Sequence, residues 1–103
     1  MTFIVATNNK VWSVEITFDP AKRQATLEQR GLDFADAAQI FEGPQLTLED
    51  DRFAYPEPRF QTYGLMNDRL VMLVWTPTSR GIRVISMRKC NEREQKAFAA
   101  RLG

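Results

Sequence analysis

One apolar run, Leu70-Val-Met-Leu-Val-Trp75, constrains the fold of this chain more than any other feature. Side chains alternate between the two faces of a β-strand, so a strand of this composition is apolar on both faces. Such a strand must be covered on both sides, and we expect it, over residues 69–76, at the centre of a sheet. The dipeptide Asn67-Asp68 predicts a tight hairpin turn that joins it to a preceding strand over residues 59–65.

Local signals predict further strands and a first helix. β-branched and aromatic residues indicate strands over residues 11–17, 46–48 and 82–87. An Asp-Pro pair begins a run of helix formers, and a glycine follows it. These residues, Asp19, Pro20 and Gly31, predict a helix that ends at Arg30.

Two more helices are expected. Asp33 can cap a helix through about Phe41, and its apolar residues fall at helical spacing. The core side of this helix is predicted to carry Phe34, Ala37, Ala38 and Phe41. Asn91 and Glu94 are placed as the two members of a capping box for a last helix over residues 91–102, with Phe98 and Leu102 on its inner face.

The order of these elements predicts an α+β fold. We expect a small antiparallel β-sheet meander packed with two N-terminal helices and one C-terminal helix. The length of 103 residues predicts a single domain over residues 1–103. We expect residues 1–14 to be an N-terminal extension, with residues 1–10 in either a hairpin with the following strand or a loose tail.

The composition limits the chemistry. The chain has no histidine and only one cysteine, Cys90. Proton transfer at neutral pH must therefore use groups other than imidazole, and a structural zinc site is nearly excluded. Cys90 is interpreted as a packing residue, and the acidic turn at residues 49–51 as a solvated loop rather than a metal site. We expect no cofactor, no metal ion, no membrane span or signal peptide, and a cytoplasmic location.

Charge is distributed unevenly. Residues 79–103 contain 7 basic and 2 acidic side chains, a net of +5, whereas the rest of the chain has a net of −4. The strand over residues 82–87 and the start of the last helix thus form a basic rim, with Arg88 and Lys89 next to a helix N-terminus that favours anions. Lys89 and Arg93 are candidate RNA contacts. A solvated basic helix face is the alternative interpretation.

Candidate site residues also lie on the strand over residues 59–65. Arg59, Gln61 and Tyr63 should share one face, where guanidinium can bind phosphate and a tyrosine ring can stack on a base. A partly exposed polar face explains them equally well. Glu57 is a candidate general base, or the partner of Arg59 in a salt bridge.

Two arginines on and at the end of the strand over residues 82–87 conflict with regular geometry. Arg83 and Arg88 have opposite parity, so they can share a face only if a bulge or the strand end intervenes. In the first helix, Lys22 is either a phosphate contact or an exposed helix lysine.

Several of these segments resemble the BrnT family of ribonuclease toxins. Phe18-Asp-Pro-Ala-Lys22 is similar to the family's aromatic-D-x-x-K motif, and Gln29-Arg-Gly-Leu-Asp-Phe34 to K-H-G-V-x-F, with Arg30 in place of histidine. Glu57-Pro-Arg-Phe60 resembles E-x-R-aromatic, and Arg83-Val-Ile-Ser-Met-Arg-Lys89 with Glu94 resembles R-I-I-S-A-R-x-A-x-x-x-E. The ordered match covers about residues 15–98.

The resemblance implies a RelE-like fold, an endoribonuclease that inhibits translation, and neutralisation by a cognate DNA-binding antitoxin. The protein would form a hetero-oligomer with that antitoxin and would contact DNA only indirectly, through the antitoxin. Its substrate would be RNA, with dependence on the ribosome left open. By their match to the family's motifs, the candidate active-site residues are Lys22, Glu57, Arg59, Arg83 and Arg88. The replacement of the family's histidine by Arg30 puts a catalytic role of that position in doubt.

The candidate residues are compatible with RNA cleavage without a metal ion. The 2′-hydroxyl would attack the adjacent phosphate, with Glu57 as base, the arginines stabilising charge, and Lys22 stabilising charge or donating a proton. Two alternatives remain: a catalytically inactive protein-interaction module, and an RNA- or ribosome-binding regulator that does not cut.

Overall fold

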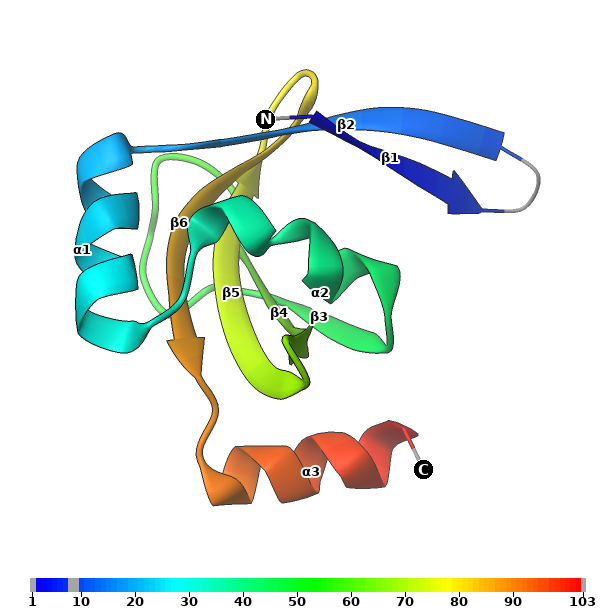
Figure 1. Ribbon diagram of the computed structural model, residues 1–103, viewed down its shortest axis with the longest axis vertical. Helices are drawn as coiled ribbons and strands as arrows, with labels where there is room; N and C mark the ends of the chain where they lie inside the picture. The colour runs from blue at the N-terminus through cyan, green and yellow to red at the C-terminus, as the bar shows by residue number, and fades with distance from the viewer. Residues whose placement is uncertain (1, 8–9, 103) are drawn as a thin grey trace.

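The computed structural model describes the backbone of residues 2–7 and 10–102 and the side chains of residues 14–101. Figure 1 shows the arrangement of its strands and helices. In chain order the elements are β1 (Thr2–Thr7), β2 (Lys10–Phe18), α1 (Pro20–Arg30), the 3₁₀ helix η1 (Phe34–Asp36), α2 (Ala38–Glu42), β3 (Gln45–Glu49), β4 (Phe60–Met66), β5 (Arg69–Pro77), β6 (Gly81–Lys89) and α3 (Glu92–Leu102). The α+β class is confirmed.

The strands form one sheet in the order β1-β2-β6-β5-β4-β3. From β3 to β6, consecutive strands pair antiparallel, as the meander predicted. The expectation of a purely antiparallel sheet is wrong, however, because β2 pairs parallel with β6. Parallel neighbours need a long crossover. Here the chain passes through α1, η1, α2 and the strands β3 to β5 before β6 returns beside β2. The sheet is therefore mixed.

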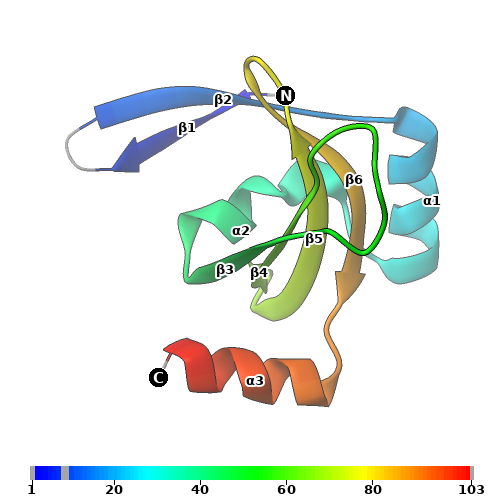
Figure 2. The same ribbon diagram turned by 180° about the vertical axis from the view of Figure 1, so that it is seen from behind.

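Strand β5 is buried on both faces, as its composition predicted. Val71 and Leu73 belong to one hydrophobic cluster, with Ile16, Phe34 and Ile40. Leu70, Met72 and Val74 belong to a second cluster, with Phe98 of α3. Figures 1 and 2 show η1 and α2 near the middle of the sheet and α3 near the end where β6 stops. We call the face of the sheet that carries Met72 and Val74 the α3 face.

The predicted ends of α1 are confirmed. The carboxylate of Asp19 accepts a hydrogen bond from the Ala21 N–H at 3.0 Å, and Pro20 occupies the first turn. Gly31 follows the helix with φ 67°, and its N–H donates to the Leu27 carbonyl at 3.0 Å. A left-handed residue at this position satisfies a carbonyl that the helix leaves unpaired, which favours glycine.

The predicted second helix is divided. Asp33 caps its start by accepting from the Ala35 N–H at 2.9 Å. The first turn, however, is the 3₁₀ helix η1, with Ala37 N–H bonded to the Phe34 carbonyl at 3.1 Å. Residue spacing alone does not separate a 3₁₀ turn from an α turn over so short a segment. The expected core residues Phe34 and Ala37 are buried, Ala38 and Phe41 pack against them partly buried, and Ile40 is buried as well.

Three further local predictions, one at the β4–β5 turn and two near the ends of the chain, have different outcomes. Asn67 and Asp68 have φ of 52° and 62°, the left-handed conformation that a two-residue hairpin turn requires. The choice that the sequence left open at the N-terminus is resolved as a hairpin, because β1 pairs antiparallel with β2. The side chain of Leu102, predicted to face inward, lies outside the described residues.

Candidate active site

A bulge in β6 decides where its two arginines point. Val74 pairs with Ser86 and the next residue, Trp75, pairs with Val84, so Ile85 is an extra residue. Such an insertion changes the alternation of side chains along the strand. Arg83 lies opposite Thr76, and Arg88 lies opposite Met72.

Thr76 and Met72 have the same parity on β5, because that strand has no extra residue of its own. Thr76 therefore points to the α3 face like Met72, and Trp75 packs in the opposite cluster. It follows that Arg83 and Arg88 share the α3 face, which a regular β6 would not allow.

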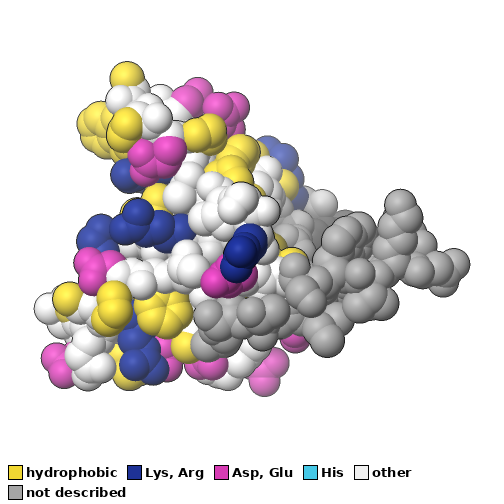
Figure 3. Space-filling model, turned by 90° about the horizontal axis from the view of Figure 1, so that it is seen from above, with side chains coloured by type: hydrophobic (Ala, Val, Ile, Leu, Met, Phe, Trp, Pro, Cys, Tyr) yellow, Lys and Arg dark blue, Asp and Glu magenta, His cyan; other side chains and the backbone are white. Residues whose placement is uncertain are grey.

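Strand β4 brings its polar residues to this same face. Tyr63 pairs with Met72 and Gln61 pairs with Val74, so both side chains lie on the α3 face, as their alternation predicted. Tyr63, Met72 and Arg88 thus form one row across three strands. Figure 3 shows the molecule from above, where Lys and Arg side chains lie in several groups on the described surface, with Asp and Glu side chains among them.

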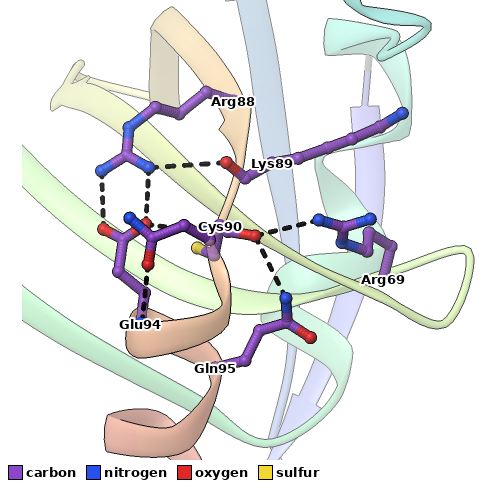
Figure 4. Close-up of polar contacts among 7 residues, drawn as sticks. Arg69, Arg88, Lys89, Cys90, Glu94 and Gln95 are labelled. Atoms are coloured by element: carbon purple, nitrogen blue, oxygen red, sulfur yellow. Dashed lines mark hydrogen bonds and ion pairs between the residues drawn. The ribbon is translucent and has the colours of Figure 1, made fainter.

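Arg88 is held by the first turn of α3. Its two terminal nitrogens donate to the two carboxylate oxygens of Glu94, each at 2.8 Å, and Nη1 also donates to the Lys89 carbonyl at 3.4 Å (Figure 4). Glu94 accepts in addition from the Asn91 N–H at 3.0 Å, while its own N–H donates to the Asn91 side chain at 2.8 Å. The predicted capping box is therefore present, and it also positions an arginine.

These contacts keep both Glu94 and Arg88 charged at neutral pH. The hydrogen bonds from Arg88 and then from the Asn91 N–H lower the pKa of Glu94 from 4.5 to about 2. The same pair raises the pKa of Arg88. Glu94 is consequently an anion at neutral pH and a poor proton acceptor.

Two neighbouring groups stay protonated. Burial, and then the charge of Glu94, raise the pKa of Cys90 to about 11, so its thiol is neither a ready nucleophile nor a ligand at neutral pH. This agrees with the packing role predicted for it. Burial is also the main cause that raises the pKa of Tyr63, whose phenol keeps its proton and can donate a hydrogen bond.

A second arginine–carboxylate pair lies at the start of β4. Arg59 Nη2 is 3.3 Å from Glu57 Oε1, the salt bridge that the sequence offered as one alternative for Glu57. The Arg59 guanidinium lies over the Tyr55 ring, 4.1 Å from its centroid. Its Nε atom is buried and has no hydrogen-bond partner within the described part of the chain. Glu57 is 40% exposed, so solvent and ligands can reach it.

A family model described as "Ribonuclease toxin, BrnT, of type II toxin-antitoxin system" matches residues 18–94. The chain belongs to the BrnT family. The match contains both arginine–carboxylate pairs and the bulged strand. A search of curated proteins finds no match. Membership makes the chain a ribonuclease toxin of a type II system, a class whose partners are an antitoxin and RNA.

Arg30 has a structural contact in this BrnT chain. Its Nη1 donates to the Met87 carbonyl of β6 at 2.7 Å. Because β2 pairs with β6 only as far as Val84, this carbonyl lies beyond the paired part of that edge. Arg30 therefore ties α1 to β6 at the position where the resemblance has histidine.

The remaining predicted site residues, Lys22, Lys89 and Arg93, are exposed. Lys22 lies in the first turn of α1, and Lys89 and Arg93 lie at the end of β6 and in α3. Among the described contacts, the side chains of these three residues make no hydrogen bond or ion pair with Arg59, Arg83 or Arg88. In the described part of the chain, no helix is long and apolar enough to span a membrane.

Sequence analysis missed the pair formed by Asp50 and Arg52. Arg52 Nε and Nη2 donate to the two oxygens of Asp50, each at 2.8 Å, and the Asp50 side chain is fully buried. These hydrogen bonds are the main cause that lowers the pKa of Asp50. Asp50 therefore helps to fold the loop before β4. The spacing of an acid and an arginine two residues apart was the only local signal for this pair.

Proposed function

We propose that this protein is a metal-independent endoribonuclease whose catalytic surface is the α3 face of the sheet. One observation carries the proposal. The bulge at Ile85 places Arg83 and Arg88 on the face that also carries Tyr63, with Arg59 at the start of the same strand. Guanidinium groups on one face suit a phosphodiester backbone, since each can donate more than one hydrogen bond to phosphate oxygens.

The proposed reaction is attack of the RNA 2′-hydroxyl on the neighbouring phosphorus. Glu57 accepts the hydroxyl proton, the bond to the 5′-oxygen breaks, and that oxygen receives a proton, for which Lys22 is our candidate. The products are a 2′,3′-cyclic phosphate and a 5′-hydroxyl. General acid–base help of this kind contributes on the order of 10²–10⁴-fold to the rate.

Glu57 suits the role of base better than Glu94 does. The pKa of Glu94 is held at about 2 by Arg88 and Asn91, which leaves it little tendency to take a proton. Glu57 has a single, longer contact to Arg59 at 3.3 Å and is accessible. An arriving phosphate can compete for Arg59 and release the carboxylate for proton transfer.

Arg88 can bind RNA without leaving Glu94. Its three hydrogen bonds use Nη1 twice and Nη2 once. A guanidinium has more N–H groups than these, and those on Nε and Nη2 share one side. Arg88 would therefore be an oriented cation that meets the developing charge of the phosphorane. Tyr63, Lys89 and Arg93 would contact flanking parts of the RNA.

The wider function that we propose follows from the family. The toxin would cut RNA in the cytoplasm and so inhibit translation, on or off the ribosome, until a cognate DNA-binding antitoxin covers it in a hetero-oligomer. The mixed sheet with helices supports a RelE-like arrangement. Only the ribonuclease-toxin class itself rests directly on the family match.

One observation favours a second candidate, a non-cleaving interaction module or RNA-binding regulator. In a chain that lacks histidine, both terminal nitrogens of Arg88 already donate to the Glu94 carboxylate. A module of this kind would bind antitoxin or RNA and leave RNA intact.

The deciding experiment is incubation of the purified protein with end-labelled RNA in EDTA, with and without ribosomes. Cleavage that leaves 2′,3′-cyclic phosphate ends, and that falls strongly in Arg83→Ala and Lys22→Ala proteins, is the expected result. Arg101→Ala is the matched control, because it removes an exposed arginine of α3 for which we propose no role. Intact RNA in both conditions would overturn the nuclease proposal, and cleavage by Lys22→Ala at the wild-type rate would remove Lys22 from it.

A further inference from the structure

We propose that Phe53, in the loop between β3 and β4, stacks on an unpaired RNA base next to the phosphate that is cleaved. This inference rests on the proposed function, because it takes RNA as the ligand. It adds a base-binding position to a site that has so far consisted of charged groups. The position would add affinity for single-stranded RNA without selecting a particular base.

Phe53 is unusually exposed for its size. Its exposed fraction is 71%, compared with 43% for Leu48 and 39% for Leu65, the other exposed large hydrophobic residues of the described part. A single exposed apolar side chain is common, but an aromatic ring in a loop beside an active site is a typical platform for single-stranded bases. Stacking accepts any base, because every base has a flat π face.

The ring belongs to a short series that leads to the catalytic arginine. Phe53 and Tyr55 make an edge-to-face contact, with centroids 5.7 Å apart and an angle of 78° between the rings. Tyr55 in turn lies under the Arg59 guanidinium. The edge-to-face contact uses at most one face of the Phe53 ring, so at least one face is open for a base.

The loop also forms a hollow. Its residues Asp51, Phe53, Tyr55, Glu57 and Arg59 are among those that line a depression of about 340 Å³. This volume lies within the usual range of small-ligand sites. The candidate base Glu57 and Phe53 both line it, so a nucleotide bound there could contact both.

Hydrogen bonds hold the two ends of this loop in place before a ligand arrives. The Asp50 N–H donates to the Arg59 carbonyl at 2.8 Å and closes the loop at its base. Asp50 also pairs with Arg52, next to Phe53. The Thr76 hydroxyl donates to the Pro58 carbonyl at 2.6 Å and ties the loop to β5 opposite Arg83. A fixed loop loses less conformational entropy when it binds.

Charge in the loop favours a base over a phosphate at Phe53. The carboxylates of Asp50 and Glu57 are paired with arginines, but Glu49 and Asp51 have no ion pair among the described contacts. These two would repel a phosphate and have little effect on a neutral base. The phosphate would then lie nearer Arg59 and Arg83, one nucleotide unit away.

The test compares Phe53→Ala, Phe53→Trp and Leu65→Ala proteins for binding to a short 2′-O-methyl RNA, which cannot be cut by attack of its own 2′-hydroxyl. We expect Phe53→Ala to bind this RNA about 10- to 100-fold more weakly, and Phe53→Trp and the control to bind within about threefold of the wild type. In a series of abasic oligonucleotides, the wild type should lose affinity at one position and Phe53→Ala should not.

The failures of the two proposals are distinguishable. A wild-type protein that cleaves RNA, with unchanged affinity in Phe53→Ala, overturns the stacking inference alone. If Phe53→Ala binds RNA normally but loses its antitoxin, the ring is a protein contact and the inference is also overturned. A wild type that neither binds nor cuts RNA overturns the proposed function itself.

Discussion

The two arginine–carboxylate pairs of the site, Arg88 with Glu94 and Arg59 with Glu57, have the same chemistry but different surroundings. The first has two contacts of 2.8 Å and a glutamate that is 22% exposed and also caps α3. The second has one contact of 3.3 Å and a glutamate that is 40% exposed. The first pair is therefore part of the fold, whereas the second can open for a ligand.

The difference also separates two uses of a carboxylate. A glutamate whose pKa is about 2 orients an arginine permanently, and the cost of removing it appears in stability. A glutamate with one long contact in a loop can exchange its partner for water or RNA, and the cost of removing it should appear in activity. Exposed pairs of the second kind contribute little to folding.

The largest expected effect is on RNA cleavage when either arginine is removed. Arg59→Ala and Arg88→Ala should each lower the cleavage rate on the order of 10²–10³-fold, because in the proposed mechanism each removes a cation that stabilises the phosphorane. Only Arg88→Ala should also be less stable, because Glu94 then lacks its partner. Single-turnover cleavage and urea unfolding of both proteins measure the two effects. An Arg88→Ala protein as stable as the wild type would show that this pair does not belong to the fold.

A smaller effect is expected on stability when the carboxylates are changed. Glu94→Ala removes both the cap and the charge and should cost about 2 kcal/mol, whereas Glu94→Gln keeps a capping side chain and should cost about half of that. Glu57→Gln should cost less than about 0.5 kcal/mol. Urea unfolding at pH 7 provides these values. The control is Glu92→Gln, which breaks the exposed Glu92–Lys96 pair and should change stability very little. Equal costs for Glu94→Ala and Glu57→Gln would contradict the comparison.

The smallest effect is the pH dependence that the Arg88–Glu94 pair adds. Folding lowers the pKa of Glu94 from 4.5 to about 2, so the unfolded chain binds more protons between these values. The stability from this group is present above about pH 4.5 and is lost as the pH falls towards 2. The difference in unfolding free energy between the wild type and Glu94→Gln should shrink over that range. A constant difference from pH 6 to pH 2 would exclude this contribution.

Much of the fold was predictable because its signals are local. Asp19, Gly31 and the Asn91–Glu94 box concern a few neighbouring residues, and each was confirmed where predicted. The apolar run in β5 and the turn at Asn67-Asp68 were confirmed for the same reason. The parallel pairing of β2 with β6 was not predicted, since the alternation of side chains says nothing about the direction of a distant partner.

The site was predictable only in part. The alternation along β4 placed Gln61 and Tyr63 on one face correctly, and Glu57 next to Arg59 was recognised as a candidate pair. The pairing of Asp50 with Arg52 and the exposure of Phe53 were missed, because loop conformation depends on contacts between residues that no periodic pattern relates. The catalytic roles themselves stay predictions.

The amino-acid sequence by itself determined most of the elements, the caps of α1 and α3, and the residue types available to the candidate site. It could state the condition under which Arg83 and Arg88 share a face, but not whether that condition is met. Only the tertiary structure decided it, because the bulge at Ile85 exists through the register of β6 against β5. Register depends on how whole strands pack and pair across the sheet, whereas a cap or a turn depends on hydrogen bonds within one short segment.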